Sequence, residues 1–388
     1  MQNRRTWAEI DLDALKENIH NIRKITEKKA MIMAVVKADA YGHGVLECAR
    51  TLLENGADQL SVACADEAIQ LRHAGISAPV LILGASFLEE ARQIVQYDIM
   101  PAVFSYELAA ALSAEAVRQR KAVKLHIKID TGMTRIGYVA GSENEKIIAE
   151  ILKIAQLPNV EVEGIFTHFA TADEKNDTYT RLQFTRFTAL CGELEQAGLR
   201  IPVRHCANSA AIMMYPEMHL DMVRAGIILY GLYPSQEVDQ SRLPLKRVMT
   251  LKARITRIET PGPDRGVSYG IEYITGRETR IATVPIGYAD GYTRLLNHKA
   301  KMNANGKIVP VVGRICMDQC MIDVTNVHTI NTGDEVIIFG ADTVTADDLA
   351  ALLGTINYEI ICMVAKRVPR VYFKNGEAVT TLNYLSKL

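Results

Sequence analysis

Between residue 31 and about residue 230, short apolar runs rich in Val, Ile and Met alternate with longer segments of helical periodicity. The apolar runs have the length and composition of buried strands. We expect strands at Met31–Val36, Gln59–Cys64, Val80–Leu83, Met100–Phe104, Val123–Ile129, Val160–His168, Val203–Cys206 and His219–Val223. Helices are expected between them, for example at Glu67–Ala74, Tyr106–Gln119, Glu145–Gln156 and Tyr179–Ala197.

Eight strands that alternate with helices predict an α/β fold with a parallel sheet. The repeat and the length fit a closed, eight-stranded β/α barrel of the TIM type. An open, doubly wound sheet is the alternative. Against it, no G-x-G-x-x-G sequence follows the first strand, so the dinucleotide-binding fingerprint is missing.

The pattern changes after Leu243-Pro244. Strand-like segments now follow one another and are separated by turn sequences such as Asn305-Gly306. They lie at Val248–Ile258, Thr279–Val284, Lys307–Val312, Met321–Val324 and Glu335–Phe339. The sequence therefore predicts a barrel over residues 1–240 and a mostly β C-terminal domain over residues 241–388. The segment Arg5–Ile10 is a candidate strand of that second domain.

Composition supports this division. A chain of 388 residues is too long for one core of ordinary size, so two domains are expected. Apolar residues make up 48% and charged residues 23%, as in soluble globular proteins. The net charge is -1 without a basic run, which argues against nucleic acid and anionic membranes as partners. No apolar stretch reaches the length of a membrane span and no signal-peptide core follows the start, so we expect a cytoplasmic protein.

The seven cysteines are scattered and form no C-x-x-C pair, which favours reduced thiols. Cys316 and Cys320 are four residues apart, but they lie in a strand-like stretch without nearby histidines. We therefore expect no metal site there.

Lys37 directly follows the first apolar run and precedes a glycine-bearing turn, Ala38 to Gly44. At the carboxyl end of a buried strand an ammonium group loses solvation, and the neutral amine then becomes available as a Schiff-base former or a general base. On position alone, a surface charge or a phosphate contact is the commoner role for such a lysine.

Two further segments indicate an anion site. Strands seven and eight run into Ala207-Asn208-Ser209-Ala210 and Arg224-Ala225-Gly226-Ile227. Small residues let backbone N–H groups approach an anion, and barrels commonly hold phosphate at this place. Both segments are also ordinary turn sequences.

Strand five carries a third group of candidates. Its alternation puts His126, Lys128 and Asp130 on one face, which is costly unless these side chains are paired.

The string AVVKADAYGHG, Ala34 to Gly44, resembles the cofactor-lysine signature of alanine racemases, which are pyridoxal 5'-phosphate (PLP) enzymes. Further motifs of this family follow in order from Trp7-Ala8-Glu9-Ile10-Asp11 to Arg367-Val368. The resemblance implies interconversion of L-alanine and D-alanine, which supplies D-alanine for cell-wall peptidoglycan. It also implies a head-to-tail homodimer in which the two subunits share each active site.

The resemblance assigns cofactor residues. Lys37 would carry PLP, and Arg224 would face the pyridine nitrogen with His168 orienting it. An arginine does not accept the ring proton, so the ring stays a weaker electron sink, which favours return of the proton over transamination. The phosphate would be held by Tyr41, Asn208, Ser209, Gly226, Ile227 and Tyr358.

The resemblance also assigns the second base and the substrate contacts. Lys37 would serve one antipode and Tyr269 of the partner subunit the other. The substrate carboxylate would bind Arg135 and the Met317 amide, supported by Asp318, with Tyr288 at the entry of the site. Lys128 matches a lysine that is carbamylated in many members, and its carbamate would orient Arg135.

Three alternatives stay open. The first is a related PLP racemase with serine or lysine as substrate. The second is a barrel-type PLP amino-acid decarboxylase, which Arg224 disfavours. The third is a non-enzymatic PLP carrier, which the β domain with Tyr269 and Met317 disfavours. One departure from the family pattern is Asp39, where many members carry asparagine.

Overall fold

The computed structural model describes residues 4–340 and 343–386. The chain forms two compact units. The barrel unit consists of Leu15–Ala40 and Val45–Lys246. The β unit consists of Met1–Ala14, Tyr41–Gly44 and Arg247–Leu388. The segment Tyr41–Gly44, which begins four residues after Lys37, thus belongs to the β unit although the chain on both sides belongs to the barrel unit.

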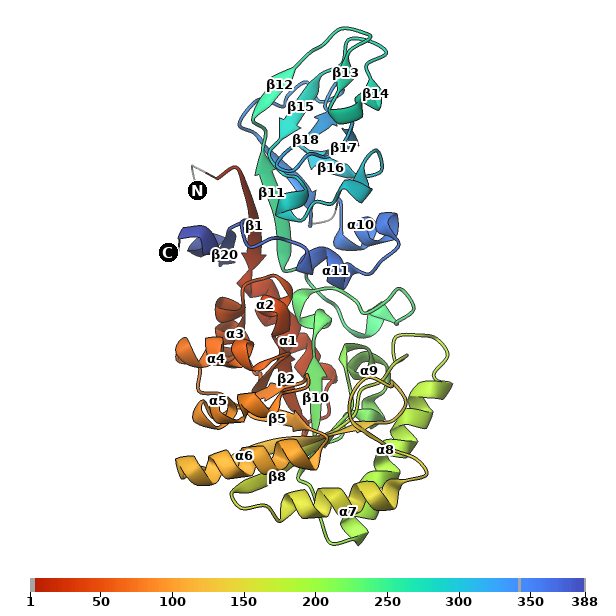
Figure 1. Ribbon diagram of the computed structural model, residues 1–388. Helices are drawn as coiled ribbons and strands as arrows, with labels where there is room; N and C mark the ends of the chain where they lie inside the picture. Colours follow the sequence, from red (N-terminus) through yellow and green to blue (C-terminus); the bar gives the residue numbers. More distant parts are fainter. Residues whose placement is uncertain (1–3, 341–342, 387–388) are drawn as a thin grey trace. The chain divides into compact units, whose positions relative to one another are not determined.

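The barrel unit contains a parallel sheet, of which β2, β5, β8 and β10 are labelled in Figure 1. Its strands follow the order β10-β2-β3-β4-β5-β6-β8-β9. Between the two ends of this path, the Asp221 N–H donates to Arg204 O at 3.1 Å and the Arg224 N–H to Ala207 O at 3.0 Å. The expected eight-stranded barrel is therefore confirmed, and it is nearly closed. The strands are β2 (Met31–Val35), β3 (Gln59–Val62), β4 (Val80–Ile82), β5 (Met100–Val103), β6 (Val123–Asp130), β8 (Val160–Phe166), β9 (Val203–His205) and β10 (Met222–Ala225), with β7 (Tyr138–Val139) paired to β6 beside them.

Helices follow the strands as the periodicity predicts. The helix α6 (Tyr106–Gln119) has the predicted bounds because Ser105 caps it, accepting the Leu108 N–H at 3.3 Å, and Arg120 ends it in a left-handed conformation with φ 54°. The other helices outside the β unit are α1 (Leu12–Ile25), α3 (Val45–Glu54), α4 (Ala65–His73), α5 (Ala91–Gln96), α7 (Asn144–Ala155), α8 (Thr178–Gln196) and α9 (Ser209–Met214).

The prediction for the last barrel strand is wrong in its bounds. His219 lies in the turn before β10 rather than in the strand, because both of its ring nitrogens bond to neighbouring segments. Nε2 lies 3.0 Å from Ile212 O, and Nδ1 lies 3.2 Å from the Glu27 N–H. Leu220 then takes a left-handed φ of 53°, so the strand begins only at Met222.

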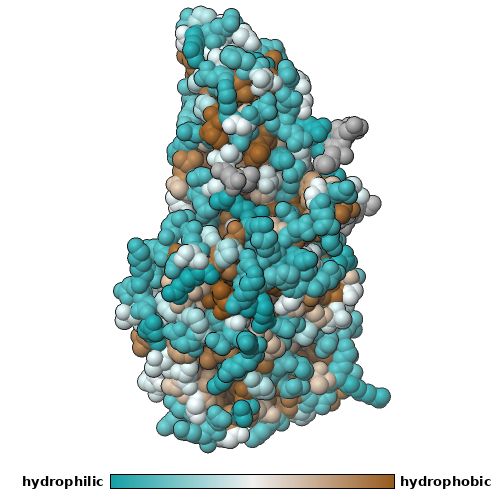
Figure 2. Space-filling model, turned by 180° about the vertical axis from the view of Figure 1, so that it is seen from behind, coloured by the Kyte–Doolittle hydropathy of each residue, from teal (hydrophilic) through white to brown (hydrophobic). Residues whose placement is uncertain are grey.

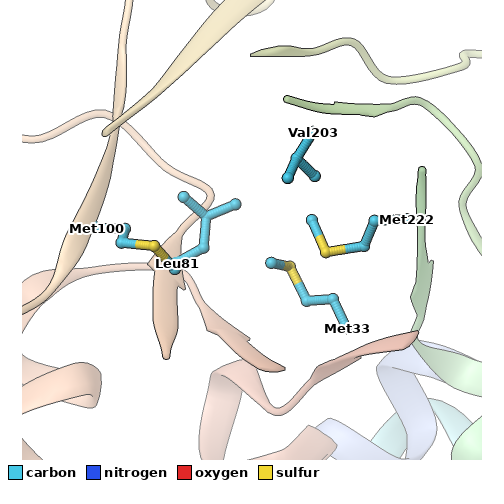
Figure 3. Close-up of a cluster of buried hydrophobic side chains, with 5 residues drawn as sticks. All are labelled: Met33, Leu81, Met100, Val203 and Met222. Atoms are coloured by element: carbon cyan, nitrogen blue, oxygen red, sulfur yellow. The ribbon is translucent and has the colours of Figure 1, made fainter. Parts of the chain in front are cut away.

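A cluster of buried apolar side chains fills part of the barrel (Figure 3). It joins residues from five strands: Met33, Leu81, Met100, Val203 and Met222. Three of the five are methionines, whose flexible thioether chains fill an irregular space well. Such a packed interior gives the strand ends a rigid base, and the candidate site residues stand on those ends.

The β unit is built on a ten-stranded sheet of order β12-β15-β18-β17-β16-β19-β11-β1-β20-β21. The candidate strand at the start of the chain is β1 (Thr6–Asp11), antiparallel to β11 and parallel to β20. The other strands are β11 (Met249–Arg254), β12 (Arg257–Glu259), β15 (Ile281–Val284), β16 (Lys301–Ala304), β17 (Lys307–Val312), β18 (Cys320–Asp323), β19 (Glu335–Phe339), β20 (Arg370–Lys374) and β21 (Glu377–Leu382), with a separate pair β13 (Gly266–Val267) and β14 (Tyr273–Ile274).

One predicted strand of this unit is two strands. The segment Val248–Ile258 divides into β11 and β12, because β11 pairs with β19 while β12 pairs with β15. Two helices, α10 (Ala346–Leu353) and α11 (Asn357–Cys362), also belong to the unit.

On the face shown in Figure 2, hydrophobic residues appear as small groups between hydrophilic ones. Within the described ranges, no helix combines the length and the apolar character needed to cross a membrane.

Candidate active site

Lys37 begins α2 (Lys37–Tyr41), a short turn that follows β2. The next four residues are left-handed: φ is 51° at Ala38, 56° at Asp39, 54° at Ala40 and 53° at Tyr41. A left-handed conformation at a residue other than glycine destabilises the fold by on the order of 1 kcal/mol. The turn behind Lys37 therefore persists only because surrounding contacts hold it.

Two carboxylates hold this turn within the barrel unit. Glu67 accepts the N–H groups of Ala38 at 2.6 Å and Ala63 at 2.7 Å. Asp39 accepts the N–H of Val45, the first residue of α3, at 2.9 Å, where a negative charge also favours the helix terminus. An asparagine oxygen would accept the same bond, so the departure from the family pattern at Asp39 preserves the local structure.

Arg224, on β10, is the centre of a buried polar network and is 2% exposed. Nη1 donates to His205 Nδ1 at 2.9 Å, and Nη2 lies 3.2 Å from His168 Nδ1. Nη2 also donates to Thr167 O at 2.9 Å and to Cys206 O at 3.1 Å. All these acceptors are neutral. Burial lowers the pKa of Arg224 to about 10, so the guanidinium stays charged at neutral pH.

The imidazoles around Arg224 are neutral. Burial, and then the charge of Arg224, holds the pKa values of His168 and His205 well below their usual range. A neutral imidazole that accepts at one nitrogen donates at the other. From this pattern we assign His205 Nε2 as the donor to His126 Nδ1, 2.9 Å away.

The network continues to the barrel surface through Glu163. With its Nδ1 accepting, His126 presents an N–H at Nε2, which lies 3.5 Å from Glu163 Oε2. The bond from His126, together with Lys124, lowers the pKa of Glu163 to about 2. The chain Glu163–His126–His205 thus links a carboxylate to the buried guanidinium of Arg224, and we call it the imidazole relay.

Glu163→Gln should lower kcat about fivefold, because a neutral acceptor makes a hydrogen bond roughly half as strong as a charged one and orients the relay less firmly. Steady-state kinetics in both directions measures this. Glu161→Gln is the matched control, since Glu161 also contacts Lys124, at 3.7 Å, whereas of these two carboxylates it is Glu163 that bonds to His126. Equal kcat values in the two variants would show that the relay does not influence the reaction.

The loops after β9 and β10 bring Asn208, Ser209 and Gly226 close to one another. Asn208 caps α9 by accepting the Ala211 N–H at 3.0 Å, and Ser209 Oγ accepts the Gly226 N–H at 2.9 Å. The hydroxyl hydrogen of Ser209 is then available to donate. Ile227 follows directly and begins a short 3-10 turn, Ile227–Tyr230. A hydroxyl donor among small residues at the carboxyl ends of barrel strands suits a phosphate.

Tyr41 and Tyr358 form a pair within the β unit. Their ring centroids are 6.1 Å apart, and Tyr358 lies on α11. Burial raises the pKa of Tyr41, so it stays a protonated phenol that can donate a hydrogen bond.

The end of β6 carries the charged group that the alternation predicts. His126, Lys128 and Asp130 are all buried, and each has partners. Lys128 Nζ donates to Ile129 O at 2.6 Å and lies 5.4 Å from the centre of the Phe166 ring. Burial, and then Arg224, lowers the pKa of Lys128 to about 7.

Asp130 shapes the loop that carries Arg135. Its carboxylate accepts the N–H groups of Gly132, Met133 and Thr134 through Oδ1 and that of Arg135 through Oδ2 at 3.2 Å. Arg135 is exposed in the single chain. Its guanidinium is thus presented at the carboxyl end of the barrel strands, where barrel enzymes bind their substrates.

Lys128→Met should change how stability depends on pH. Since the pKa of about 7 in the folded protein lies below the ordinary value of 10.5, the unfolded chain binds more protons between these pH values. The unfolding free energy of the wild type should therefore rise relative to Lys128→Met from pH 7 to 10.5, by at most about 1.4 kcal/mol per pH unit. Urea denaturation in carbon dioxide-free buffer measures the difference, and a constant difference would contradict a depressed pKa.

In the β unit, a cavity of about 730 Å³ gathers three of the predicted residues: Tyr269, Met317 and Asp318. Tyr269 is 72% exposed and Met317 is 53% exposed. Tyr288 stands next to this group, because its N–H donates to Cys316 O at 3.1 Å. The catalytic and substrate residues predicted for the β unit therefore share one surface that a single chain leaves open.

The local backbone fixes Tyr269 on this surface. Ser268 has a positive φ of 68°, and its hydroxyl donates to Arg314 O at 2.6 Å. A Cβ atom placed on Gly270 would lie 2.9 Å from the Arg314 guanidinium carbon. The tyrosine thus begins a tight turn that has an arginine packed against it.

Sequence reasoning did not select several residues that support the site: Glu67, Glu163, Phe166, His205 and Arg367. Arg367 bonds both Asp318, at 2.7 Å, and Asp290, at 2.9 Å. Only His205 carried a signal, as a histidine in the strand that leads into the Asn208-Ser209 segment. The others are ordinary charged or aromatic residues whose partners lie far away in the sequence.

The chain is similar in sequence to known proteins. Two family models match the chain: the alanine racemase N-terminal domain over residues 10–234 and the alanine racemase C-terminal domain over residues 248–372. Alanine racemase 1 of Clostridium acetobutylicum is 50% identical over 385 residues, which cover 98% of this chain and 99% of that protein. The alanine racemase of Clostridium tetani is also 50% identical, over 386 residues that cover 98% and 99%.

Solved structures agree with the sequence matches. The alanine racemase of Clostridium difficile 630 superposes with a TM-score of 0.96 at 44% identity, covering 99% of this chain and 100% of that one. The alanine racemase of Bacillus anthracis, solved with bound L-Ala-P, has a TM-score of 0.93 at 38% identity and covers 100% and 99%.

Proposed function

Since the chain belongs to the alanine racemase family, we propose that Lys37 and Tyr269 are the two groups that exchange the α-proton as L-alanine and D-alanine interconvert. The enzyme is an isomerase, and its product D-alanine serves cell-wall peptidoglycan. We assign it to the cytoplasm. The observation that best supports the residue assignment is the buried Arg224 guanidinium, which donates to four neutral acceptors.

The residues around Arg224 fit pyridoxal 5'-phosphate as the cofactor. When bound, PLP supplies a conjugated ring that withdraws electrons from the substrate α-carbon. Arg224 would donate to the pyridine nitrogen, which is a neutral acceptor like its other partners. Lys37 would hold the cofactor covalently. The phosphate would be bound by Tyr41, Asn208, Ser209, Gly226, Ile227 and Tyr358.

Two proton carriers are needed because racemisation removes a proton from one face of the α-carbon and returns one to the opposite face. We assign Lys37 to one face and Tyr269 to the other. Arg224 keeps its own protons at neutral pH, so it would leave the pyridine nitrogen of the bound cofactor unprotonated and would limit how far charge leaves the α-carbon. Prompt return of a proton to that carbon follows.

The substrate carboxylate would be bound by Arg135 and by the Met317 amide. Asp318, held by Arg367, would support that loop, and Tyr288 would line the entry. Neutral Lys128 is able to react with carbon dioxide: a nitrogen–carbon bond forms and the amine loses a proton. The carbamate that results would exchange a cation beside Arg135 for an anion that orients it.

A head-to-tail homodimer would complete each site. Support comes from the open surface of the β unit, where apolar side chains gather near the cavity with Tyr269. Ile271 is 61% exposed and Ile274 is 57% exposed, in addition to Tyr269 and Met317. Single exposed apolar residues are ordinary, but such a group marks an interaction surface. The β unit of one subunit would thus cover the barrel of its partner.

The PLP-loaded protein, incubated with a panel of L-amino acids, tests the substrate assignment. D-alanine should form fastest, with serine and lysine slower. Faster formation of D-serine or D-lysine would identify one of the related racemases. Release of carbon dioxide would identify a decarboxylase. If the protein binds PLP but forms no D-amino acid, it is a non-enzymatic PLP carrier.

A further inference from the structure

The turn that follows Lys37 accepts hydrogen bonds from the C-terminal part of the chain. Arg370, at the start of β20, is 1% exposed, and its Nε donates to Gly42 O at 2.9 Å. Two residues further, the Tyr372 hydroxyl donates to His43 O at 3.1 Å. These bonds join positions 328 and 329 residues apart in the sequence. The backbone just beyond Lys37 thus depends on β20.

The rest of the Arg370 guanidinium is anchored in its own segment. Nη1 donates to Ala365 O at 2.7 Å and to Val368 O at 2.6 Å, and Nη2 donates to Val364 O at 2.6 Å. A planar fork with fixed donor directions is able to serve four carbonyl groups at once, whereas the single ammonium of lysine is not. Gly42 O is therefore held by a side chain that has little freedom of its own.

Close packing accompanies these bonds. A Cβ atom on Gly42 would lie 2.4 Å from Ile361 O, and one on Gly44 would lie 1.9 Å from the Tyr372 hydroxyl oxygen. Both glycines also have left-handed φ values, 82° and 89°. Neither position tolerates a side chain, so the turn rests directly on α11 and β20. The same helix α11 carries Tyr358, the ring partner of Tyr41.

We propose that Arg370 and Tyr372 are positioning residues that fix the turn Lys37–Gly44 and so set the places of the Lys37 amine and the Tyr41 hydroxyl. The inference rests on the proposed role of Lys37. Four consecutive left-handed residues without glycine relax toward ordinary backbone conformations when their outer contacts are lost. Lys37 adjoins these residues, so its amine would then sample several positions, and proton transfer requires one.

Arg370→Lys and Tyr372→Phe test the proposal with matched controls. Arg72 likewise donates to four carbonyl groups, those of Ile76, Ala78, Tyr97 and Asp98, but in the barrel unit around α4. Arg72→Lys therefore removes a comparable anchor away from the turn. Tyr233→Phe removes a hydroxyl that donates to Leu243 O at 2.8 Å.

The first measurement is amide hydrogen exchange of residues 38–45 in the cofactor-free protein. Arg370→Lys should speed exchange there about tenfold, as expected for loss of a charge-assisted bond, and Tyr372→Phe about threefold. Arg72→Lys and Tyr233→Phe should leave this segment unchanged. If Arg370→Lys does not fold, Tyr372→Phe carries the test, since it removes one hydroxyl only.

The second measurement is the dissociation constant of PLP, read from its visible absorption when bound. Arg370→Lys should weaken binding about tenfold and lower kcat more than it changes KM for alanine. Unchanged exchange and binding, or changes equal to those in Arg72→Lys, would overturn the proposal. If reduction with borohydride leaves no adduct on Lys37 of the wild type, the proposed function fails instead, and the exchange experiment still decides whether the turn is held.

Discussion

Replacement of Lys37 by alanine should abolish racemisation, with kcat/KM for alanine falling roughly 10⁴-fold or more. Lys37 is assigned both the covalent hold on PLP and one of the two proton transfers, so its loss removes two functions at once. Formation of D-alanine from L-alanine measures the activity, and peptide mapping after borohydride reduction locates the covalent cofactor.

Lys37→Arg separates chemistry from charge. Arginine keeps the positive charge but stays protonated at any pH at which the protein is folded, so it neither attaches PLP nor accepts the α-proton. Both variants should therefore be equally inactive, while the exposed control Lys29→Ala should match the wild type. An arginine variant with more than about a tenth of wild-type activity would reduce Lys37 to an electrostatic role.

The barrel could be predicted from sequence because its signals are local. Each strand is a short apolar run, and the helices between them have the amphipathic period, so most bounds lie within two residues of those observed. The error at His219 has a different origin. Its two ring bonds, to Ile212 and Glu27, are tertiary contacts that delay the strand, and no local pattern announces them.

The site could be predicted only where its residues lie in contiguous motifs. Lys37 and Ser209 lie a few residues beyond the ends of β2 and β9, and Arg224 lies within β10. The conformation behind Lys37 could not be predicted, because the left-handed stretch Ala38–Tyr41 contains no glycine, the residue that usually indicates positive φ. The imidazole relay and the hydrogen bonds of Arg370 also could not be predicted from the sequence, since they depend on side chains that meet only after folding.

The turn that begins at Lys37 contains residues of both units. Residues 37–40 belong to the barrel unit and residues 41–44 to the β unit, so a turn of eight residues connects the proposed cofactor lysine to both. Cofactor binding should consequently respond to substitutions in the C-terminal part of the chain as well as in the barrel.

Mixed dimers of Lys37→Ala and Tyr269→Phe subunits should regain activity although each variant alone is inactive. In a site shared between subunits, the intact Lys37 of one chain meets the intact Tyr269 of the other. Random reassociation of equal amounts makes half of the dimers mixed, and each mixed dimer has one intact site of two. The mixture should therefore reach about one quarter of wild-type activity.

The exposure of Tyr269 makes this a sharp test. Because the side chain is 72% exposed in the single chain, removal of its hydroxyl should leave the fold of the subunit intact. A control mixture of Lys37→Ala with the double variant Lys37→Ala, Tyr269→Phe contains no chain with an intact Lys37, so it should stay inactive. If the first mixture also stays inactive after verified subunit exchange, Lys37 and Tyr269 act within one chain, and the open surface of the β unit needs another explanation.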